Sequence, residues 1–451
     1  MKILLSLWSW VWTALLSVLL SVFLVIAQVN AMMDTKVMSI KEQQDMINKI
    51  EKLLRGNYIY PEKTDDYIKY LQQRLDQGVY SKLLSKHDVA KQLTHDLYEA
   101  SQDLHFSVMY DRGLVQSLRN IDNEHKLDDL REQDRKASIA NNHNFMAVQI
   151  LAGNVGYMRF DYFADPEFAH DIVAASMKFV ANTDALIIDL RNNNGGHMEL
   201  SQLLMSYLFR YEDDKPLYDY YYNDDGKTLA RKMWLLPSVS EQKYLDKPVY
   251  ILTSSFTFSA AEWMAYVLKN RNRAVVVGEV TAGGAHPVGA KVINDDLVIN
   301  IPIGEVKDPL TDTDFEGEGI TPDVEAYFSE ALHTAHKIAL ENLQKQYPKN
   351  SKDYAWHIEK LETLTNPVQL SDELLSLYQG EFGVRKIWKK EGNLYYNWKN
   401  KGRFRLIPMS KTQFMFEGLD DFRFEMIIED GVFTQLKRID KDGSSRLYQR
   451  N

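Results

Sequence analysis

Ser259 stands where a short apolar run ends and a helix is predicted to begin. The run 249–253 is typical of a buried strand, and Ser259 with Glu262 matches a capping box at a helix start. A serine at such a turn exposes its hydroxyl, and the backbone N–H groups beside it can bind a developing oxyanion. Ser259 is therefore a candidate nucleophile as well as a candidate helix cap.

Three glycine-containing segments could complete a site. Residues 189–196 place an Asp-x-Arg pair before a Gly-Gly turn, whose N–H groups can approach a ligand closely. Residues 278–287 lack the Gly-Lys-Ser/Thr ending of a phosphate-binding loop. Residues 315–323 carry Glu316. Taken singly, residues 278–287 and 315–323 are better explained as ordinary surface turns. Residues 189–196 could be a plain Asn-Gly turn, but the two charges at the end of an apolar strand weaken that explanation.

In this order, the segments resemble the superfamily of C-terminal processing proteases, tricorn core proteases and interphotoreceptor retinoid-binding protein modules. The resemblance covers about residues 36–327. It rests on Asp-Leu-Arg-x-Asn-x-Gly-Gly, Thr-x-Ser-Ala-x-Glu, Gly-Glu-x-Thr-x-Gly-Gly and Glu-x-x-Gly-Ile-x-Pro-Asp. It implies an α/β fold with a crotonase-like core of ββα units and Ser259 as the nucleophile. It also implies an oxyanion site formed by the amides of Ala260 and Gly195, with Gly196 as the other candidate.

The resemblance also bears on the base that activates the serine. The processing proteases use a lysine where this chain has Gly284, and the chain lacks their inserted peptide-binding PDZ module. The tricorn-like branch instead uses a histidine oriented by a glutamate, positions that His105 and Glu316 resemble. Histidine suits proton transfer near neutral pH. His197 and His286 remain rival bases, because both lie on loops beside candidate site residues.

One position departs from the tricorn-like pattern, because Leu104 stands where that branch has a serine before the histidine. Ser107 and His286 are the candidate supporting residues.

No metal or organic cofactor is expected, since the sequence has no His-Glu-x-x-His spacing. It also has no cysteine, which excludes a thiol nucleophile and thiolate metal sites.

The elements that must position these residues divide the chain into five parts. Strand-like runs alternate with amphipathic segments between residues 144 and 327, which predicts a layered α/β core, and a Tyr-rich insert at 215–236 predicts an antiparallel ribbon. The predicted parts are a signal peptide or N-terminal anchor (1–31), a helical cap (36–108), a crotonase-like peptidase core (144–327), a helical linker (329–364) and a small antiparallel β domain (369–451).

The N-terminus predicts export. Lys2 precedes an apolar run at residues 3–27, and Val29-Asn30-Ala31 offers a small-residue cleavage pattern. The run is longer than a usual signal core and could span a bilayer of about 30 Å. Cleavage is favoured over a retained anchor formed by residues 3–27. We expect an extracytoplasmic protein, periplasmic or secreted, whose contact with a membrane is limited to this segment.

These inferences predict an exported serine peptidase acting on peptide or protein substrates. The formal net charge of -10 argues against binding to nucleic acid. An alternative on the same fold is a non-catalytic module for apolar ligands, but loss of the serine or the base would mark that class, and both are present. A crotonase-type enzyme acting on acyl thioesters is a third alternative, which export disfavours.

Overall fold

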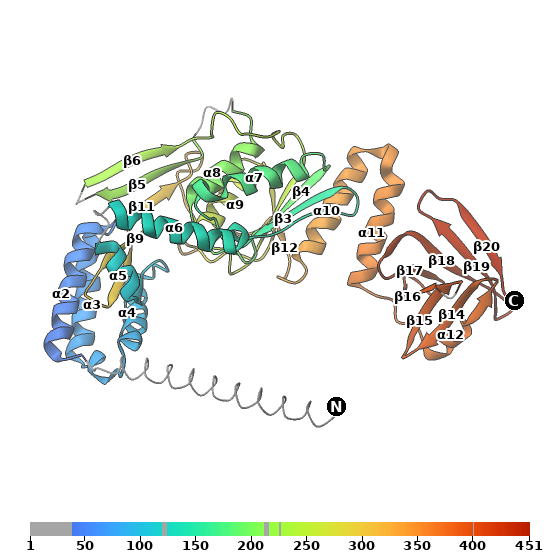
Figure 1. The fold of residues 1–451 in the computed structure, drawn as a ribbon, viewed down its shortest axis with the longest axis horizontal. Coiled ribbons are helices and arrows are strands. Elements are labelled where there is room, and N and C mark those ends of the chain that lie inside the picture. Colours follow the sequence, from blue (N-terminus) through green and yellow to red (C-terminus); the bar gives the residue numbers. More distant parts are fainter. Residues whose placement is uncertain (1–37, 120–123, 212–215, 225–226, 400) are drawn as a thin grey trace, which may run out of the picture.

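The computed structural model describes residues 38–119, 124–211, 216–224, 227–399 and 401–451. Its helices and sheets confirm the mixed α/β class, with N-terminal helices at one end, a layered sheet in the middle and an antiparallel sheet at the other end (Figure 1). The predicted signal or anchor at residues 1–31 lies outside the described residues. Within the described ranges, no helix is long and apolar enough to cross a membrane.

The central sheet positions the loops that carry Ser259 and the Gly-Gly turn. Its described strands run in the order β12-β8-β7-β4-β3-β2, with β2 antiparallel to β3 at one edge and the other pairings parallel. Every residue of the two middle strands β4 and β7 is buried, as expected for parallel strands covered on both faces. The strands are β2 (Phe145–Leu151), β3 (Val155–Phe160), β4 (Ala185–Asp189), β7 (Val249–Thr253), β8 (Val275–Gly278) and β12 (Val324–Glu325).

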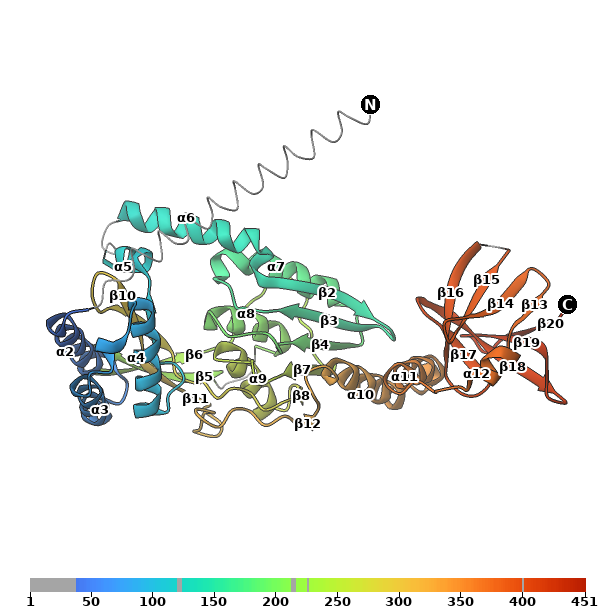
Figure 2. The same ribbon diagram turned by 90° about the horizontal axis from the view of Figure 1, so that it is seen from below.

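Helices cover both faces of this sheet. On one face lie α7 (Pro166–Val180), α8 (Met198–Leu208) and α9 (Ala260–Asn270), and on the other lies α10 (Ala331–Gln346), followed by α11 (Ser351–Thr365) (Figure 2). The side chains of β4 alternate between the two faces, which explains why helices cover both. Leu186 and Ile188 pack on the first face, and Ala185 and Ile187 pack on the second. The carboxyl ends of β4, β7 and β8 consequently meet at one edge, the usual place for a site in such sheets.

The N-terminal helices attach to the core through a second sheet. The helices α2 (Ile40–Asn57), α3 (Thr64–Asp76) and α4 (Lys86–Ser101) pack on β1 (Ser107–Tyr110), β10 (Leu297–Pro302) and β9 (Val288–Val292). In the antiparallel β1–β10 pair, Val108 lies opposite Ile299. Residues 102–106 are thereby held against the core. Short 3-10 turns lie at Pro61–Lys63, Tyr80–Lys82, Asn142–Asn144 and Pro348–Asn350.

Two helices and one ribbon fill the space between these parts. No element is predicted from the sequence for residues 109–143, where the structure has α5 (Arg112–Arg119) and α6 (Glu124–Ala140). The residues of α6 are mostly charged or polar, which hides its helical period. The predicted ribbon is confirmed as the antiparallel hairpin of β5 (Tyr218–Asp224) and β6 (Lys227–Met233), to which β11 (Gly304–Lys307) is added.

The C-terminal segment forms an eight-stranded antiparallel meander, preceded by a helix that the sequence analysis did not predict. This helix, α12 (Asp372–Leu377), begins at Ser371, whose Oγ accepts a hydrogen bond from the N–H of Leu374 at 3.3 Å. The strands are β13 (Gly380–Phe382), β14 (Arg385–Lys390), β15 (Asn393–Trp398), β16 (Lys401–Pro408), β17 (Gln413–Phe416), β18 (Leu419–Glu429), β19 (Val432–Asp440) and β20 (Ser445–Gln449). The meander contacts α11 through Arg423, whose guanidinium lies 3.7 Å from the ring centroid of Trp356.

We predict that His336 on α10 makes the fold sensitive to mild acid. Its Nε2–H donates to the carbonyl of Ala152 at 2.8 Å, and burial lowers its pKa to about 4. As the pH falls below the unfolded-state pKa of about 6.5, the unfolded chain binds a proton at this histidine, whereas the folded chain does not. Folding stability is therefore lost between about pH 6.5 and 4. The expected loss is about 2 kcal/mol between pH 7 and 5. Urea unfolding at both pH values checks this, and His336→Gln should remove that part of the pH dependence. An unchanged pH dependence in the variant contradicts the prediction.

Candidate active site

Ser259 occupies a strained turn between β7 and α9. Its backbone angles are φ 55 and ψ -121, a region that non-glycine residues rarely adopt, and the side chain is half-buried. Such a sharp strand-to-helix turn lifts a serine hydroxyl above the sheet edge, as in nucleophile elbows. Strain of this kind costs about 1–3 kcal/mol and persists where the surroundings hold it. The turn therefore meets the geometric requirement for a serine nucleophile.

Glu262 is the group that holds this turn. Its side chain is fully buried, and Oε2 accepts hydrogen bonds from the N–H groups of Ser259 at 2.8 Å and Gly284 at 2.9 Å. Oε1 accepts from Thr281 Oγ1 at 2.6 Å and from the N–H of Gly283 at 2.7 Å. Burial raises the pKa of Glu262, and these hydrogen bonds oppose the rise. Glu262 thus has two roles. It caps the helix as predicted, and it also links the Ser259 turn to the 281–284 loop.

The Gly-Gly turn packs directly on Ser259. A Cβ atom on Gly195, whose φ is +100, would lie 2.8 Å from the Cβ of Ser259 and 3.2 Å from the backbone nitrogen of Ala260. A side chain at Gly195 would therefore displace the turn. The N–H of Gly195 donates to Oδ1 of Asn193 at 2.9 Å. In contrast, the N–H groups of Gly196 and Ala260 have no hydrogen-bond acceptor among the described residues.

The Asp-x-Arg pair before this turn is part of its frame. Asp189 is buried and accepts hydrogen bonds from Arg191 and from the hydroxyl of Tyr157 at 2.7 Å. Arg191 also donates to the carbonyl of Phe328. The two charges that the sequence places at the end of β4 therefore satisfy each other, as buried charges must.

A cluster of four ionisable side chains, Asp103, His105, His286 and Glu316, lies at the same edge of the core, with their ligand-type atoms all within 4.8 Å of one another. The Nδ1 atom of His286 lies 2.9 Å from Asp103 Oδ2 and 3.6 Å from Glu316 Oε2. The Nδ1 atom of His105 lies 3.5 Å from Asp103 Oδ1 and 4.0 Å from Glu316 Oε2. We call these four residues the His–carboxylate cluster.

The charges in this cluster perturb one another. Burial acts to raise the pKa of Asp103, but the two neighbouring imidazoles outweigh it and hold that pKa well below its usual range. Burial acts to lower the pKa of His286, but Asp103 and Glu316 together raise it. Burial raises the pKa of Glu316. Asp103 is thus an anion that favours a proton on the facing Nδ1 of His286.

His105 connects the cluster to the Ser259 segment. Its ring is buried, neither ring nitrogen has a hydrogen-bond partner among the described residues, and the ring lies against Phe258 at 4.7 Å between centroids. A Cβ atom on Gly284 would lie 2.1 Å from Phe258 Cε2 and 2.8 Å from His105 Cε1. The position where the processing proteases have a lysine is therefore filled here by the rings of Phe258 and His105.

The remaining candidates are placed elsewhere. Ser107 lies on β1, and its Oγ accepts a hydrogen bond from Asn300 at 3.0 Å, with no bond to the cluster among the described residues. His197 is exposed before the first turn of α8.

Asp103 was not singled out from the sequence. The Asp-x-His spacing was the available signal, because an Asp side chain readily accepts a hydrogen bond from the N–H two residues later, as Asp103 does from His105 at 2.9 Å.

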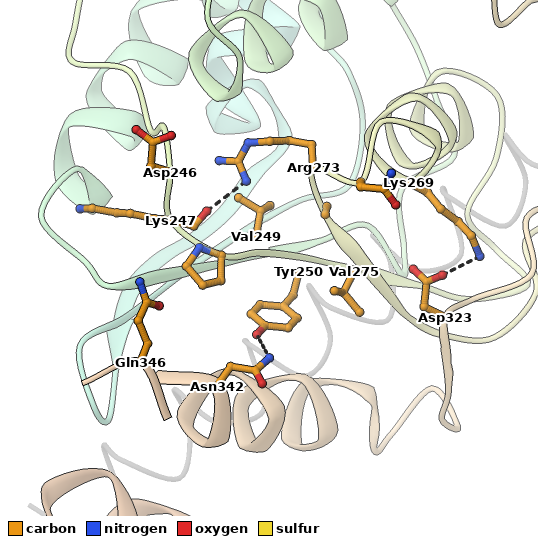
Figure 3. A pocket seen from close by; sticks show the side chains of 13 residues that line it. Asp246, Lys247, Val249, Tyr250, Lys269, Arg273, Val275, Asp323, Asn342 and Gln346 are labelled. Atoms are coloured by element: carbon orange, nitrogen blue, oxygen red, sulfur yellow. Dashed lines mark hydrogen bonds and ion pairs between the residues drawn. The ribbon is translucent and has the colours of Figure 1, made fainter. Parts of the chain in front are cut away.

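A pocket at the opposite end of β7 and β8 contains none of these residues (Figure 3). Three of its polar or charged side chains bind a neighbouring side chain or the backbone. Arg273 donates to the carbonyl of Lys247 at 3.0 Å, Lys269 pairs with Asp323 at 2.9 Å, and Asn342 donates to the hydroxyl of Tyr250 at 2.9 Å. These contacts hold neighbouring elements together, so the pocket has a structural explanation.

The chain matches two family descriptions. Residues 154–326 match peptidase family S41, and residues 32–139 match the N-terminal domain of peptidase S41 in eukaryotic IRBP. The chain is 26% identical over 208 residues to carboxy-terminal processing protease CtpA of Bacillus subtilis, covering 46% of this chain and 41% of the relative. It is 27% identical over 173 residues to a carboxyl-terminal-processing protease of Picosynechococcus, covering 38% of each. The matches thus span less than half the length of these relatives.

Among solved structures, a lipoprotein from Streptococcus agalactiae is 15% identical, with a TM-score of 0.45, covering 66% of this chain and 96% of that chain. The photosystem II D1 C-terminal processing protease is 21% identical, with a TM-score of 0.32, covering 40% and 47%. The two family matches span both the N-terminal helices and the central sheet, where Ser259 and the His–carboxylate cluster meet. The chain belongs to the superfamily that its motifs resemble, and its residues 154–326 match peptidase family S41.

Proposed function

We propose that this protein is a serine peptidase in which Ser259 is the nucleophile and His105 the general base. The observation that carries the proposal is the packing of the Gly-Gly turn on Ser259, because a Cβ on Gly195 would lie 2.8 Å from the serine Cβ. One point of the fold then combines a half-buried serine, a helix N-terminus and backbone donors that have no acceptor among the described residues. This combination suits stabilisation of a tetrahedral oxyanion.

In the proposed reaction, Ser259 Oγ attacks the substrate carbonyl carbon while His105 Nε2 takes the hydroxyl proton. The oxyanion accepts hydrogen bonds from the N–H groups of Ala260 and Gly196. Gly196 is preferred over Gly195, because the Gly195 N–H is bound to Asn193. The proton then passes from His105 to the leaving amine. A water molecule hydrolyses the acyl-enzyme by the same steps in reverse.

The base requires an orienting group on its second nitrogen. The His–carboxylate cluster supplies two, since Nδ1 of His105 lies 3.5 Å from Asp103 and 4.0 Å from Glu316. We propose that these distances shorten when substrate binds, as catalytic hydrogen bonds often do. Asp103 and His286 would then supply the polar contact that Leu104 cannot, while Ser107 stays with Asn300.

The proposal extends to organisation and location. The core at 144–327 would be a crotonase-like unit, capped by residues 36–108, linked through 329–364 to a β domain at 369–451. The substrate would be an extended peptide or protein segment reaching the sheet edge outside the cytoplasm, exported through residues 1–31. The apolar-ligand module is not favoured, because the matched family is one of peptidases.

Covalent labelling of the full chain with a fluorophosphonate probe tests this proposal. Wild type should label with one equivalent, Ser259→Ala should not label, and His105→Ala should label at least about 100-fold more slowly, the usual contribution of a general base. Ser255→Ala is the matched control, because Ser255 is an exposed serine on the same turn. Equal labelling of wild type and Ser259→Ala contradicts the nucleophile. Loss of labelling in His286→Ala with retention in His105→Ala contradicts the base.

A further inference from the structure

We propose that the His–carboxylate cluster binds one zinc ion, and that the ion reversibly inhibits the peptidase by occupying Nδ1 of His105. The proposal rests on the function proposed above, since it concerns the same histidine. The ligand set, two imidazoles and two carboxylates, is one that zinc accepts. The sequence carries no contiguous metal motif, because the ligands come from three separate loops.

The geometry of the cluster matches a tetrahedral site. Zinc bonds of about 2.0–2.1 Å place neighbouring ligand atoms about 3.3 Å apart. Nδ1 of His286 and Nδ1 of His105 lie 2.9 and 3.5 Å from different oxygens of Asp103 and 3.6 and 4.0 Å from Glu316 Oε2, and the ligand-type atoms of the four residues all lie within 4.8 Å of one another. Small side-chain rotations are therefore sufficient to bring the four ligand atoms to bonding distance.

The hydrogen bonds around His286 leave its Nδ1 atom directed at the carboxylate of Asp103. The hydroxyl of Tyr60 donates to Glu305 Oε1 at 3.0 Å, so its oxygen accepts from Nε2–H of His286 at 3.3 Å. Nδ1 of a neutral His286 would then direct a lone pair at Asp103 Oδ2, only 2.9 Å away. Two acceptors repel at that distance. Either a second proton or a metal cation between them removes the conflict.

The other ligands have a matching environment. His105 is 7% exposed, and neither of its ring nitrogens has a partner among the described residues. Glu316 Oε1 is likewise buried without a partner in the described part of the chain. Backbone amides hold both carboxylates, since His105 N–H donates to Asp103 Oδ1 at 2.9 Å and Ala285 N–H to Glu316 Oε2 at 2.6 Å. Such outer contacts orient metal ligands.

Zinc on Nδ1 of His105 would stop the proposed reaction, because it would fix the tautomer of the imidazole. A neutral imidazole bound to the metal through Nδ1 carries its single proton on Nε2. Nε2 then has no lone pair to accept the Ser259 proton. Any proton displaced from a ligand atom leaves to solvent as the ion binds.

Titration of the chelator-treated full chain with Zn²⁺ tests binding without reference to activity. Calorimetry should give one equivalent, Co²⁺ should give the visible absorption of a tetrahedral site, and Ser259→Ala should bind as wild type does. His286→Gln and Asp103→Asn should each weaken binding at least about 10-fold, while the exposed His87→Gln should not. Absent binding, or equal binding by His286→Gln and His87→Gln, overturns the site.

The inhibitory role is measured separately by fluorophosphonate labelling of Ser259. Saturating Zn²⁺ should slow labelling at least about 100-fold, chelator should restore it, and the His286→Gln variant should resist the same Zn²⁺ concentration. Stoichiometric binding that leaves labelling unchanged overturns inhibition. Zinc binding by a wild type that takes no label would leave the metal site standing and contradict the proposed peptidase function instead.

Discussion

Replacing Ser259 with alanine is expected to lower kcat for casein hydrolysis by about 10⁵–10⁶, and His105→Ala should cost nearly as much. The reason is that neither group acts alone in the proposed mechanism, since the hydroxyl is a weak nucleophile without its base. The double variant should consequently be no slower than either single variant. Release of fluorescent fragments from labelled casein measures these rates.

A second histidine of the cluster provides the control for this prediction. His286 contacts Asp103 and Tyr60, and it is proposed to support His105. We therefore expect a loss of about 10–100-fold for His286→Gln, the cost typical of an outer orienting group. A collapse of kcat in His286→Gln together with near-normal turnover in His105→Ala would reverse the two roles. Additive losses in Ser259→Ala/His105→Ala would contradict a nucleophile and base that act as one unit.

Glu262→Ala is expected to lower the free energy of unfolding by about 3–5 kcal/mol, the largest single effect on stability that we predict. The change removes a buried carboxylate and leaves four donors without an acceptor, namely the N–H groups of Ser259, Gly283 and Gly284 and the hydroxyl of Thr281. It should also abolish labelling of Ser259, because the backbone N–H of the strained residue would lose its acceptor and the turn its link to the 281–284 loop. Urea unfolding and probe labelling measure the two effects.

Two further variants separate the hydrogen bonds from the bulk of the side chain. Glu262→Gln keeps the size and one acceptor oxygen, so its cost should fall between those of wild type and alanine. Glu199→Ala removes an exposed glutamate from the first turn of α8 and should change stability by less than about 0.5 kcal/mol. If Glu262→Ala is no more costly than Glu199→Ala, the buried carboxylate does not hold the site together.

The elements of the core were predictable because their signals are local. The strand at 155–160 and the helix at 166–180 lie where an apolar run and a proline at the first helical position mark them in the sequence. The helix α6 was missed because nearly all of its faces are polar. The helix α12 was missed because its six residues lie within a segment of alternating strands, although Ser371 is a typical cap.

The candidate site was predictable to the extent that its residues share a continuous motif. Ser259 and Glu262 lie three positions apart, so their contact follows from helix geometry. The partnership of Asp103 with His286 joins residues separated by 183 positions, and the β1–β10 and β10–β9 pairings bring them together. The choice between Gly195 and Gly196 depends on one hydrogen bond to Asn193, which no spacing encodes.

The positive φ of Ser259 has a consequence for how this family can evolve. Only glycine adopts φ 55, ψ -121 without strain, so the protein keeps serine there at a cost in stability. In a lineage that no longer needs hydrolysis, drift to glycine at this position would relieve the strain in a single step. Serine retained in this turn is therefore a mark of continuing selection for chemistry, and glycine there would identify descendants that have become binding proteins.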